Sequence, residues 1–465
     1  GNRRMPDHPG AIPHLTLGYT VFSPVYISEK LKEAKAKEPK AAALPNEPAL
    51  DVTAVEERLA YDAAKLWKGS VFPRTEGTNG LVSGAAAYWR ILKGLPKEPA
   101  KAFASVRDEL AGLNARAVYF ASKEGDVAIR EATREYGRRS PYQIPRIKGT
   151  FALHQLRLLL GNERFRAAAD AAFTANAGRE VSAEELVAAL SKGAGRDVAP
   201  FLAPWIEEKG FPDPKVEARA RKDGKGWRVT LTVTQEGRPY HFLGSVAIDA
   251  GDRRLVKPFE VKGARIEVAF TVDEKPTRLE FDAGRDLPVP LENPYTFLSF
   301  TDEFRHAKVV YGTTRQVEAN HTLALRFQTL LADTYSEELP PVVKDSELTE
   351  EELAASDLFV LGAPSDNALA ARLARKLPAT FGAGWFAYDG KTYGRSDDGL
   401  YLCLPNPWNP ERVVWLFAGN SALQLHQMTK AWGGSLPQWA VYRSEEVRAR
   451  GWASVERFVF EDVAR

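Results

Sequence analysis

The hydrophobic pattern of this chain changes twice along its length, and each change limits the folds available to it. Apolar residues recur at the helical period from 53 to 202 and alternate with polar residues from 214 to 290. From about 293, short apolar runs alternate with helical segments. Because 465 residues are too many for one hydrophobic core, the three patterns predict separate domains. We assign 1–50 to an N-terminal segment with a strand-like stretch, 51–212 to a helical domain, 213–292 to a β-sandwich and 293–465 to an α/β domain.

The helical region is divided by Gly and Pro residues, which favour helix ends. Ser182 and Glu185 form a capping-box pattern that predicts a helix start at this point. The periodicity predicts helices over 53–67, 82–92, 100–112, 125–137, 148–160, 163–175, 184–190 and 197–209.

The alternating region is typical of antiparallel strands with one buried face. Its turns are glycine-containing, at 223–226 and 236–238. We expect strands over 215–221, 227–235, 240–248, 264–270 and 277–282, packed as a small antiparallel sandwich.

The last region predicts a mostly parallel, doubly wound sheet, because strands and helices alternate. Strands are expected over 308–311, 342–343, 358–361, 385–388, 400–404 and 413–418. In such sheets ligands bind at the carboxyl ends of strands. Seven small or polar residues follow predicted strands and are candidate ligand-binding residues: Thr313, Thr314, Ser365, Asp366, Asn367, Asn420 and Ser421. Tight turns and helix caps favour the same residue types, so ordinary turn chemistry is the alternative.

Composition excludes several classes of function. The chain has 63 basic and 61 acidic residues, so its net charge of +2 gives no electrostatic argument for nucleic acid as a partner. No run of about 18 apolar residues is present, which predicts no transmembrane segment. The single cysteine, Cys403, excludes an internal disulfide. Neither a dinucleotide-binding glycine pattern, a Walker loop nor a G-x-S-x-G motif occurs.

Two segments of the helical region carry a recognisable motif. Residues 59–69 read L-A-Y-D-A-A-K-L-W-K-G, and residues 84–88 read G-A-A-A-Y. They resemble the M1 (gluzincin) aminopeptidase family, in which the corresponding segments read H-E-x-x-H-x-W-x-G and E-G-x-A-x-Y. The resemblance implies a thermolysin-type remnant followed by a helical bundle.

Three further segments resemble the same family. Residues 148–157 read K-G-T-F-A-L-H-Q-L-R, residues 160–165 read L-G-N-E-R-F, and residues 205–212 read W-I-E-E-K-G-F-P. They are similar to the family's K-G-x-x-x-L-x-x-L-R, L-G-x-x-x-F and W-x-x-x-x-G-x-P patterns. Members of the family often carry a β-sandwich directly after these helices, in agreement with the predicted order.

The residues that would bind zinc are replaced. On the resemblance, Tyr61 and Lys65 stand in place of the two zinc histidines, Asp62 replaces the general-base glutamate and Ser83 replaces the third ligand. A catalytic zinc needs three lone-pair donors, whereas Lys is cationic and a phenol is rarely deprotonated at neutral pH. We therefore expect no metal and no cofactor at this position.

The catalytic tyrosine of the family is also replaced. It precedes the motif lysine by two residues, where this chain has Arg146, and Tyr142 lies four residues earlier. Because two cations in one cleft repel each other, we expect Lys65 and Arg146 to face a shared site with an acid from this chain or a partner. His154 is expected to be a satisfied, buried histidine rather than a ligand.

Three functional hypotheses follow. The favoured one is a catalytically inactive M1-like protein that acts as a binding or assembly subunit. The first alternative is a hydrolase or small-ligand-binding protein with its site in the α/β domain. The second is one part of a split or cleaved M1-like peptidase, completed by a protein partner or by a missing N-terminal part. The compartment stays open, although the α/β region is similar to those of large exported bacterial hydrolases.

Overall fold

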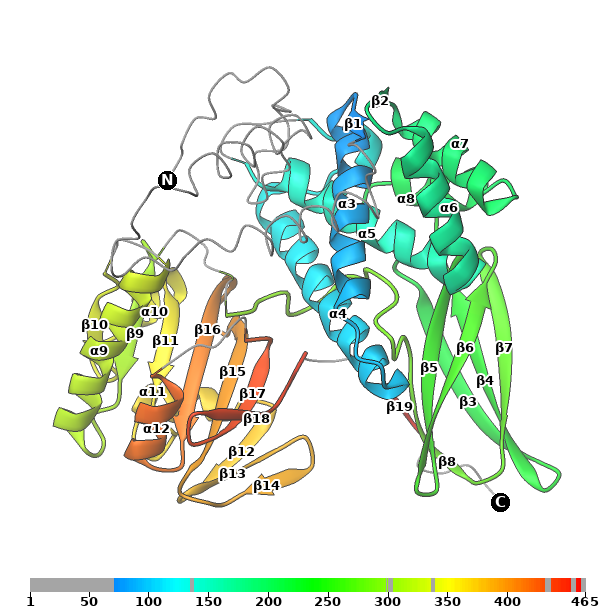
Figure 1. Ribbon diagram of the computed structural model, residues 1–465. Coiled ribbons are helices and arrows are strands. Elements are labelled where there is room, and N and C mark those ends of the chain that lie inside the picture. Colours follow the sequence, from blue (N-terminus) through cyan, green and yellow to red (C-terminus); the bar gives the residue numbers. More distant parts are fainter. Residues whose placement is uncertain are drawn as a thin grey trace, which may run out of the picture. The chain divides into compact units, whose positions relative to one another are not determined.

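The computed structural model describes residues 71–133, 138–297, 299, 304–335, 339–430, 436–452 and 457–460. The chain divides into two compact units (Figure 1). The first comprises residues 1–110, 120–290 and 455–465, and the second comprises 111–119 and 291–454. Mixed α and β structure with several sheets is thus confirmed. Of the described helices, none is both long and apolar enough to cross a membrane.

The first unit begins with a helical part. Its helices are α3 (Glu76–Lys93), α4 (Pro99–Glu124), α5 (Ser140–Leu160), α6 (Asn162–Ala175), α7 (Ala183–Ala194) and α8 (Ala199–Glu207), with residues 111–119 of α4 assigned to the second unit. A short parallel pair, β1 (Phe72–Pro73) and β2 (Glu180–Val181), accompanies them. The predicted capping box at Ser182 and Glu185 is confirmed.

One helix prediction was wrong, and the start of another was placed too late. Where a helix was expected over 125–137, the described residues contain only a 3-10 turn, Ile129–Glu131. Helix α5 begins at Ser140 instead of 148, although Pro141 and Pro145 lie in its first two turns. Proline is tolerated at a helix start because the first amides have no acceptor inside the helix, so Pro141 favours this earlier start.

Close packing of α3 against α5 is made possible by glycine. A Cβ atom at Gly84 would lie 2.7 Å from the backbone carbon of Gly149 and the nitrogen of Thr150. A Cβ at Gly149 would lie 2.6 Å from the carbonyl oxygen of Gly80. Since no side chain fits at these points, the two backbones are in direct contact.

Two antiparallel sheets complete the first unit. One has the order β3-β4-β7 and the other β19-β8-β5-β6. Their strands are β3 (Lys215–Asp223), β4 (Gly226–Thr234), β5 (Phe242–Ala250), β6 (Arg253–Val261), β7 (Arg265–Val272), β8 (Pro276–Glu280) and β19 (Arg457–Val459). Sequence analysis missed β6 because Pro258 interrupts its pattern. Pro258 is tolerated within the strand because β6 lies at the edge of its sheet.

The second unit contains a seven-stranded sheet of order β10-β9-β11-β16-β15-β17-β18. Strands β10 (Val342–Lys344), β9 (Ala307–Tyr311), β11 (Asp357–Leu361) and β16 (Asn409–Gly419) are parallel neighbours. Strands β15 (Asp398–Asn406), β17 (Trp439–Arg443) and β18 (Glu446–Gly451) pair antiparallel. The expectation of a mostly parallel sheet was therefore wrong. Only two residues connect β15 to β16, too few for the crossover that parallel neighbours require.

Helices cover both faces of this sheet, as in a doubly wound arrangement. Side chains of β11 alternate: Phe359 and Leu361 pack with α9 (Val317–Tyr335) and α12 (Ala422–Met428). Leu358 and Val360 pack on the other face with α10 (Glu350–Ala355) and α11 (Ala368–Ala374). A separate sheet joins β12 (Ala379–Gly382), β13 (Trp385–Tyr388) and β14 (Lys391–Tyr393), so the predicted strand 385–388 forms outside the main sheet.

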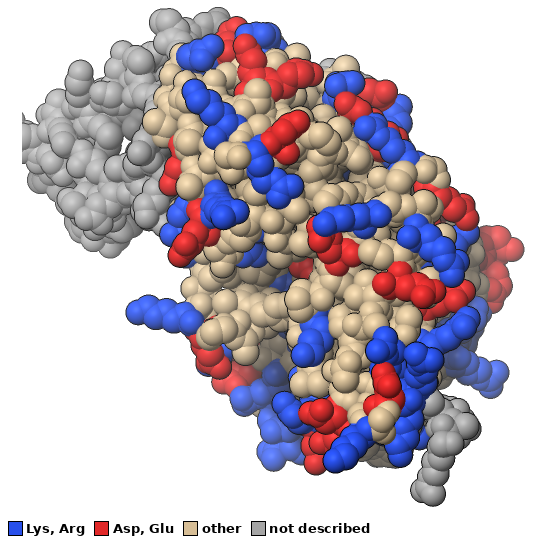
Figure 2. Space-filling model, turned by 90° about the vertical axis from the view of Figure 1, so that its right-hand side faces the viewer, with Lys and Arg blue, Asp and Glu red and all other residues tan. Residues whose placement is uncertain are grey.

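Surface charge is mixed. Figure 2 shows basic and acidic side chains interspersed with uncharged surface on the face in view. This agrees with the near balance of 63 basic and 61 acidic residues.

Candidate functional site

Two of the five positions implied by the family resemblance lie in described structure. Tyr61, Asp62 and Lys65 lie outside the described residues. Ser83 lies on α3 and Arg146 on α5, both half-buried. A Cβ at Gly84, next to Ser83, would lie 2.9 Å from the carbonyl oxygen of Arg146. The two positions therefore occupy facing turns of the closely packed helix pair.

The hydroxyl of Ser83 is engaged within its own helix. Its Oγ donates to the carbonyl oxygen of Asn79 at 2.6 Å, with Gly80 O at 3.4 Å. Hydroxyls in helices commonly bond back one turn in this way. Among the described residues, no group of three or more His, Cys, Asp or Glu side chains could hold a metal ion.

The motif lysine, Lys148, joins three segments of the first unit. Its Nζ lies 2.8 Å from Asp126 Oδ2 and donates to Val127 O at 3.2 Å. Asp126 Oδ2 also accepts from the backbone N–H of Gly210, and the Lys148 ammonium lies 5.1 Å from the ring centre of Phe211. Burial lowers the pKa of Lys148, opposed by the Asp126 carboxylate. The K-G and G-F-P segments that resemble the family are thus in contact.

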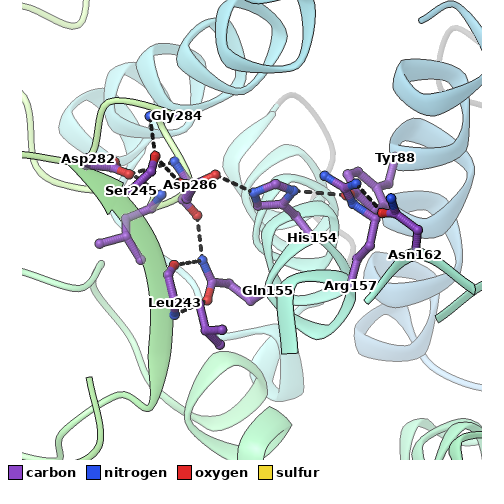
Figure 3. A network of polar contacts seen from close by, with 11 residues as sticks. Tyr88, His154, Gln155, Arg157, Asn162, Leu243, Ser245, Asp282, Gly284 and Asp286 are labelled. Atoms are coloured by element: carbon purple, nitrogen blue, oxygen red, sulfur yellow. Dashed lines mark hydrogen bonds and ion pairs between the residues drawn. The ribbon is translucent and has the colours of Figure 1, made fainter. Parts of the chain in front are cut away.

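A chain of buried polar groups runs from α3 through α5 to the loop after β8 (Figure 3). Tyr88 Oη lies 2.9 Å from His154 Nδ1, and His154 Nε2 lies 2.9 Å from Asp286 Oδ1. Arg157 Nε donates to Tyr88 Oη. Ser245 Oγ donates to Asp286 Oδ2 at 3.0 Å. His154 is indeed buried and hydrogen-bonded.

The direction of the hydrogen bonds follows from the protonation states. Burial lowers the pKa of His154 despite the Asp286 carboxylate, so the imidazole is neutral at neutral pH. Burial raises the pKa of Tyr88, so its phenol keeps its proton. Tyr88 therefore donates to Nδ1, and Nε2–H donates to Asp286. Because both ring nitrogens of His154 are engaged, the arrangement holds side chains in place and lacks a free general base.

The loop that holds Asp286 is itself strained and polar. Asp282 has φ of 50° and Arg285 has φ of 56°, in the left-handed region. Asp282 Oδ1 accepts from the backbone N–H of Asp286 at 2.8 Å. Burial, together with the nearby Asp286 carboxylate, raises the pKa of Asp282 to about 8. Gln155 Nε2 donates to the carbonyl oxygen of Asp286 at 2.8 Å, which ties the loop to α5.

Five of the candidate residues in the α/β region form one cluster. Thr313 Oγ1 donates to Asp345 Oδ1 at 2.6 Å, and Asp366 O accepts from Thr314 N at 3.3 Å. Ser365 Oγ donates to Asp366 Oδ2 at 2.8 Å. Asn367 caps α11 and donates to Leu361 O at 2.9 Å. These polar groups bond to neighbouring turns, as ordinary turn chemistry would have them.

Asn420 and Ser421 belong to a second cluster, after β16. Asn420 Nδ2 donates to Arg395 O at 2.8 Å and to Tyr393 O at 3.2 Å. Ser421 caps α12 and donates to Ser396 O at 2.8 Å. Both residues thereby connect the segment 393–396 to the end of β16 by hydrogen bonds.

Sequence analysis missed Asp286, Ser245 and the role of Arg157. His154 and Asp286 are 132 residues apart in sequence, and Ser245 and Asp286 are 41 apart. Hydrophobic periodicity relates residues within one helix or strand, so it cannot predict contacts between a helix, a strand and a loop. The K-G-x-x-x-L-x-x-L-R resemblance marks Arg157 but gives no partner for it.

A scan against protein-family models finds no match for this chain. A solved structure, Legionella pneumophila aminopeptidase A in complex with aspartic acid, is similar over 62% of this chain and 31% of its own, at 18% identity and a TM-score of 0.34. A likeness of this size supports no inference about fold or activity. The aminopeptidase N of Lactococcus lactis subsp. lactis is 28% identical over 107 residues, which is 20% of this chain and 13% of the relative. Weak homology to an aminopeptidase N therefore holds for one stretch, and the chain spans a small part of that relative's length.

Proposed function

We propose that this protein is an M1-like chain without peptidase activity that serves as a binding or assembly subunit. The observation that carries the proposal is the state of Ser83. Its hydroxyl, at the position where the resemblance implies the third zinc ligand, donates to Asn79 O at 2.6 Å. A serine hydroxyl turned into its own helix is a poor replacement for a carboxylate ligand.

The packing of α3 on α5 supports the same proposal. Gly80, Gly84 and Gly149 bring the two backbones into contact beside Ser83 and Arg146. Direct contact between the two helices at the positions that the resemblance assigns to the site supports a role as a scaffold.

The replaced residues favour an acidic partner. Lys65 and Arg146 add two cations where the family has a histidine and a tyrosine. In the proposed function these two cations supply positive charge that attracts a carboxylate of a bound polypeptide. Charge complementarity of this kind selects partners and speeds association.

Binding without cleavage is the experimental signature. We expect a fluorescently labelled glutamate-rich peptide to bind the purified chain and to remain intact after prolonged incubation. Arg146→Ala should weaken binding by about 2 kcal/mol or more, because one cation of the site is lost. Arg164→Ala, on the exposed part of α6, is the matched control and should bind like the unmodified chain.

Reporter substrates provide the second arm. Aminoacyl and dipeptidyl reporters should show no hydrolysis above a blank without protein. Hydrolysis by the unmodified chain that withstands chelators would contradict the proposal and direct attention to the α/β region. Hydrolysis that chelators abolish would contradict it too, since it would restore a metallopeptidase assignment.

A further inference from the structure

A cavity of about 160 Å³ lies between α3, α5 and α6 in the first unit. Its wall is largely apolar and includes Leu92, Leu153, Phe165 and Phe173. A cavity of similar size in an apolar core, about 150 Å³, accommodates benzene. The space therefore suits a compact apolar group the size of an aromatic ring.

Arg157 places a positive charge at the wall of this cavity. Among the described residues, no carboxylate lies within 4.0 Å of its guanidinium nitrogens. Its Nε donates to Tyr88 and its Nη1 donates to Asn162 Oδ1 at 2.7 Å, both uncharged acceptors. The two other charged residues of the lining, Arg166 and Asp170, are exposed and of opposite sign. The half-buried guanidinium thus has no carboxylate within ion-pair distance among the described residues.

Trp89 also lines the cavity. Its indole N–H is buried without a hydrogen-bond acceptor in the described part of the chain.

The guanidinium is held in a fixed position. Tyr88, which accepts from Arg157, is itself fixed by His154, and His154 by Asp286 (Figure 3). The ring of Phe165 packs edge-on against Tyr88, with the ring centres 5.9 Å apart. A charge oriented in advance binds an anion without the entropic cost of ordering a free side chain.

We propose that this cavity binds a small monocarboxylate with an aromatic or branched apolar body. The body fills the apolar space between the three helices, and the carboxylate accepts hydrogen bonds from Arg157. Asp286, through His154 and Tyr88, positions that arginine. This site involves neither Ser83 nor Arg146 and does not depend on the proposed loss of peptidase activity.

Isothermal titration calorimetry on the full chain, with phenylacetate as the probe, tests the proposal. We expect a dissociation constant below about 1 mM for this ten-heavy-atom ligand. The neutral analogue 2-phenylethanol, with a hydroxymethyl group in place of the carboxylate, should bind about tenfold more weakly or worse, since it lacks the charge that pairs with Arg157. No measurable binding of phenylacetate, or equal affinity for the two compounds, would overturn the proposal.

Two variants test separately the contribution of the Arg157 charge and that of the cavity volume. Arg157→Gln should weaken phenylacetate binding at least about tenfold and leave 2-phenylethanol binding nearly unchanged. Ala169→Leu should block both compounds, because Ala169 lines the cavity and a larger side chain fills it. Arg164→Gln, on α6 but outside the lining, is the control and should bind as the unmodified chain does.

These variants also make the test robust against misfolding. Circular dichroism and thermal unfolding establish that each variant is folded before titration. If Arg157→Gln does not fold, the comparison of phenylacetate with 2-phenylethanol and the Ala169→Leu result decide the matter. Undiminished phenylacetate binding to folded Ala169→Leu would place the ligand elsewhere and refute the assignment.

Discussion

His154 Nε2 lies 2.9 Å from Asp286 Oδ1, and this contact connects α5 to the loop after β8. The His154 side chain is 1% exposed and that of Asp286 is 10% exposed. The same unit contains a second pair at similar distance, His241 Nε2 to Glu260 Oε1 at 2.8 Å, but there the side chains are 28% and 35% exposed. Two histidine–carboxylate pairs of nearly equal length thus differ mainly in burial.

The first prediction uses this difference. His154→Ala should lower the free energy of unfolding by about 3 kcal/mol, because it leaves Asp286 and Tyr88 buried without their partner. His241→Ala should cost less than about 1 kcal/mol, as is usual for solvent-accessible pairs. Denaturant unfolding of both variants provides the comparison, and equal losses would show that burial does not determine the strength of the first pair.

The second prediction concerns pH. The pKa of Asp282 is raised from 3.8 to about 8 by burial and by Asp286, so the folded state holds a proton that the unfolded state releases. Stability from this group is full below about pH 4 and is lost as the pH rises towards 8. Between pH 5 and pH 8 the unmodified chain should lose roughly 2–4 kcal/mol relative to Asp282→Asn, which cannot ionise.

The comparison with Asp282→Asn also removes the contribution of His154. The lowered pKa of His154 works in the opposite direction, since its stability is present above pH 6.5 and is lost at lower pH. Both proteins share that term, so it cancels in the difference between their unfolding curves. Parallel curves for the two proteins from pH 5 to pH 8 would mean that Asp282 is ionised throughout.

The third prediction tests the contact between α3 and α5. Gly84→Ala should cost about 1–3 kcal/mol, because the added Cβ would lie 2.7 Å from backbone atoms of α5 and the helices must separate. Gly94→Ala is the control: its Cβ would meet no atom closer than 3.7 Å, and its φ is −83°. We expect Gly94→Ala to unfold within about 0.5 kcal/mol of the unmodified chain. An unchanged free energy of unfolding for Gly84→Ala would show that α3 and α5 are not in direct backbone contact at this point.

Much of the fold could be predicted from local pattern. The change from helical to alternating period predicted the described helices α3, α4, α6, α7 and α8 and the strands β3, β4, β5, β7 and β8. The helix expected over 125–137 is not found among the described residues, and the segment 1–50 and the helix expected over 53–67 lie outside them. Features that local patterns do not encode were missed. Pro258 interrupts the pattern of the edge strand β6, which was therefore not predicted. The two-residue connection between β15 and β16 makes these strands antiparallel, although parallel strands were expected.

The candidate site was less accessible to sequence reasoning. Burial of His154 could be predicted from its position among apolar helix residues. Its partner Asp286 could not, because a loop 132 residues away supplies it. The absence of a carboxylate within ion-pair distance of Arg157 depends on which side chains meet in three dimensions, and residue spacing in the sequence does not predict these contacts.

The central claim, that the M1-like frame has lost its zinc site, is tested most directly by the zinc content of the purified chain. After purification from zinc-supplemented medium, mass spectrometry should find less than about one-tenth equivalent of zinc, because Tyr61, Lys65 and Ser83 supply no ligand set. The combined variant Tyr61→His, Asp62→Glu, Lys65→His and Ser83→Glu should regain zinc if the helical frame is intact. Stoichiometric zinc in the unmodified chain that is lost on Tyr61→Ala or Lys65→Ala would contradict the account.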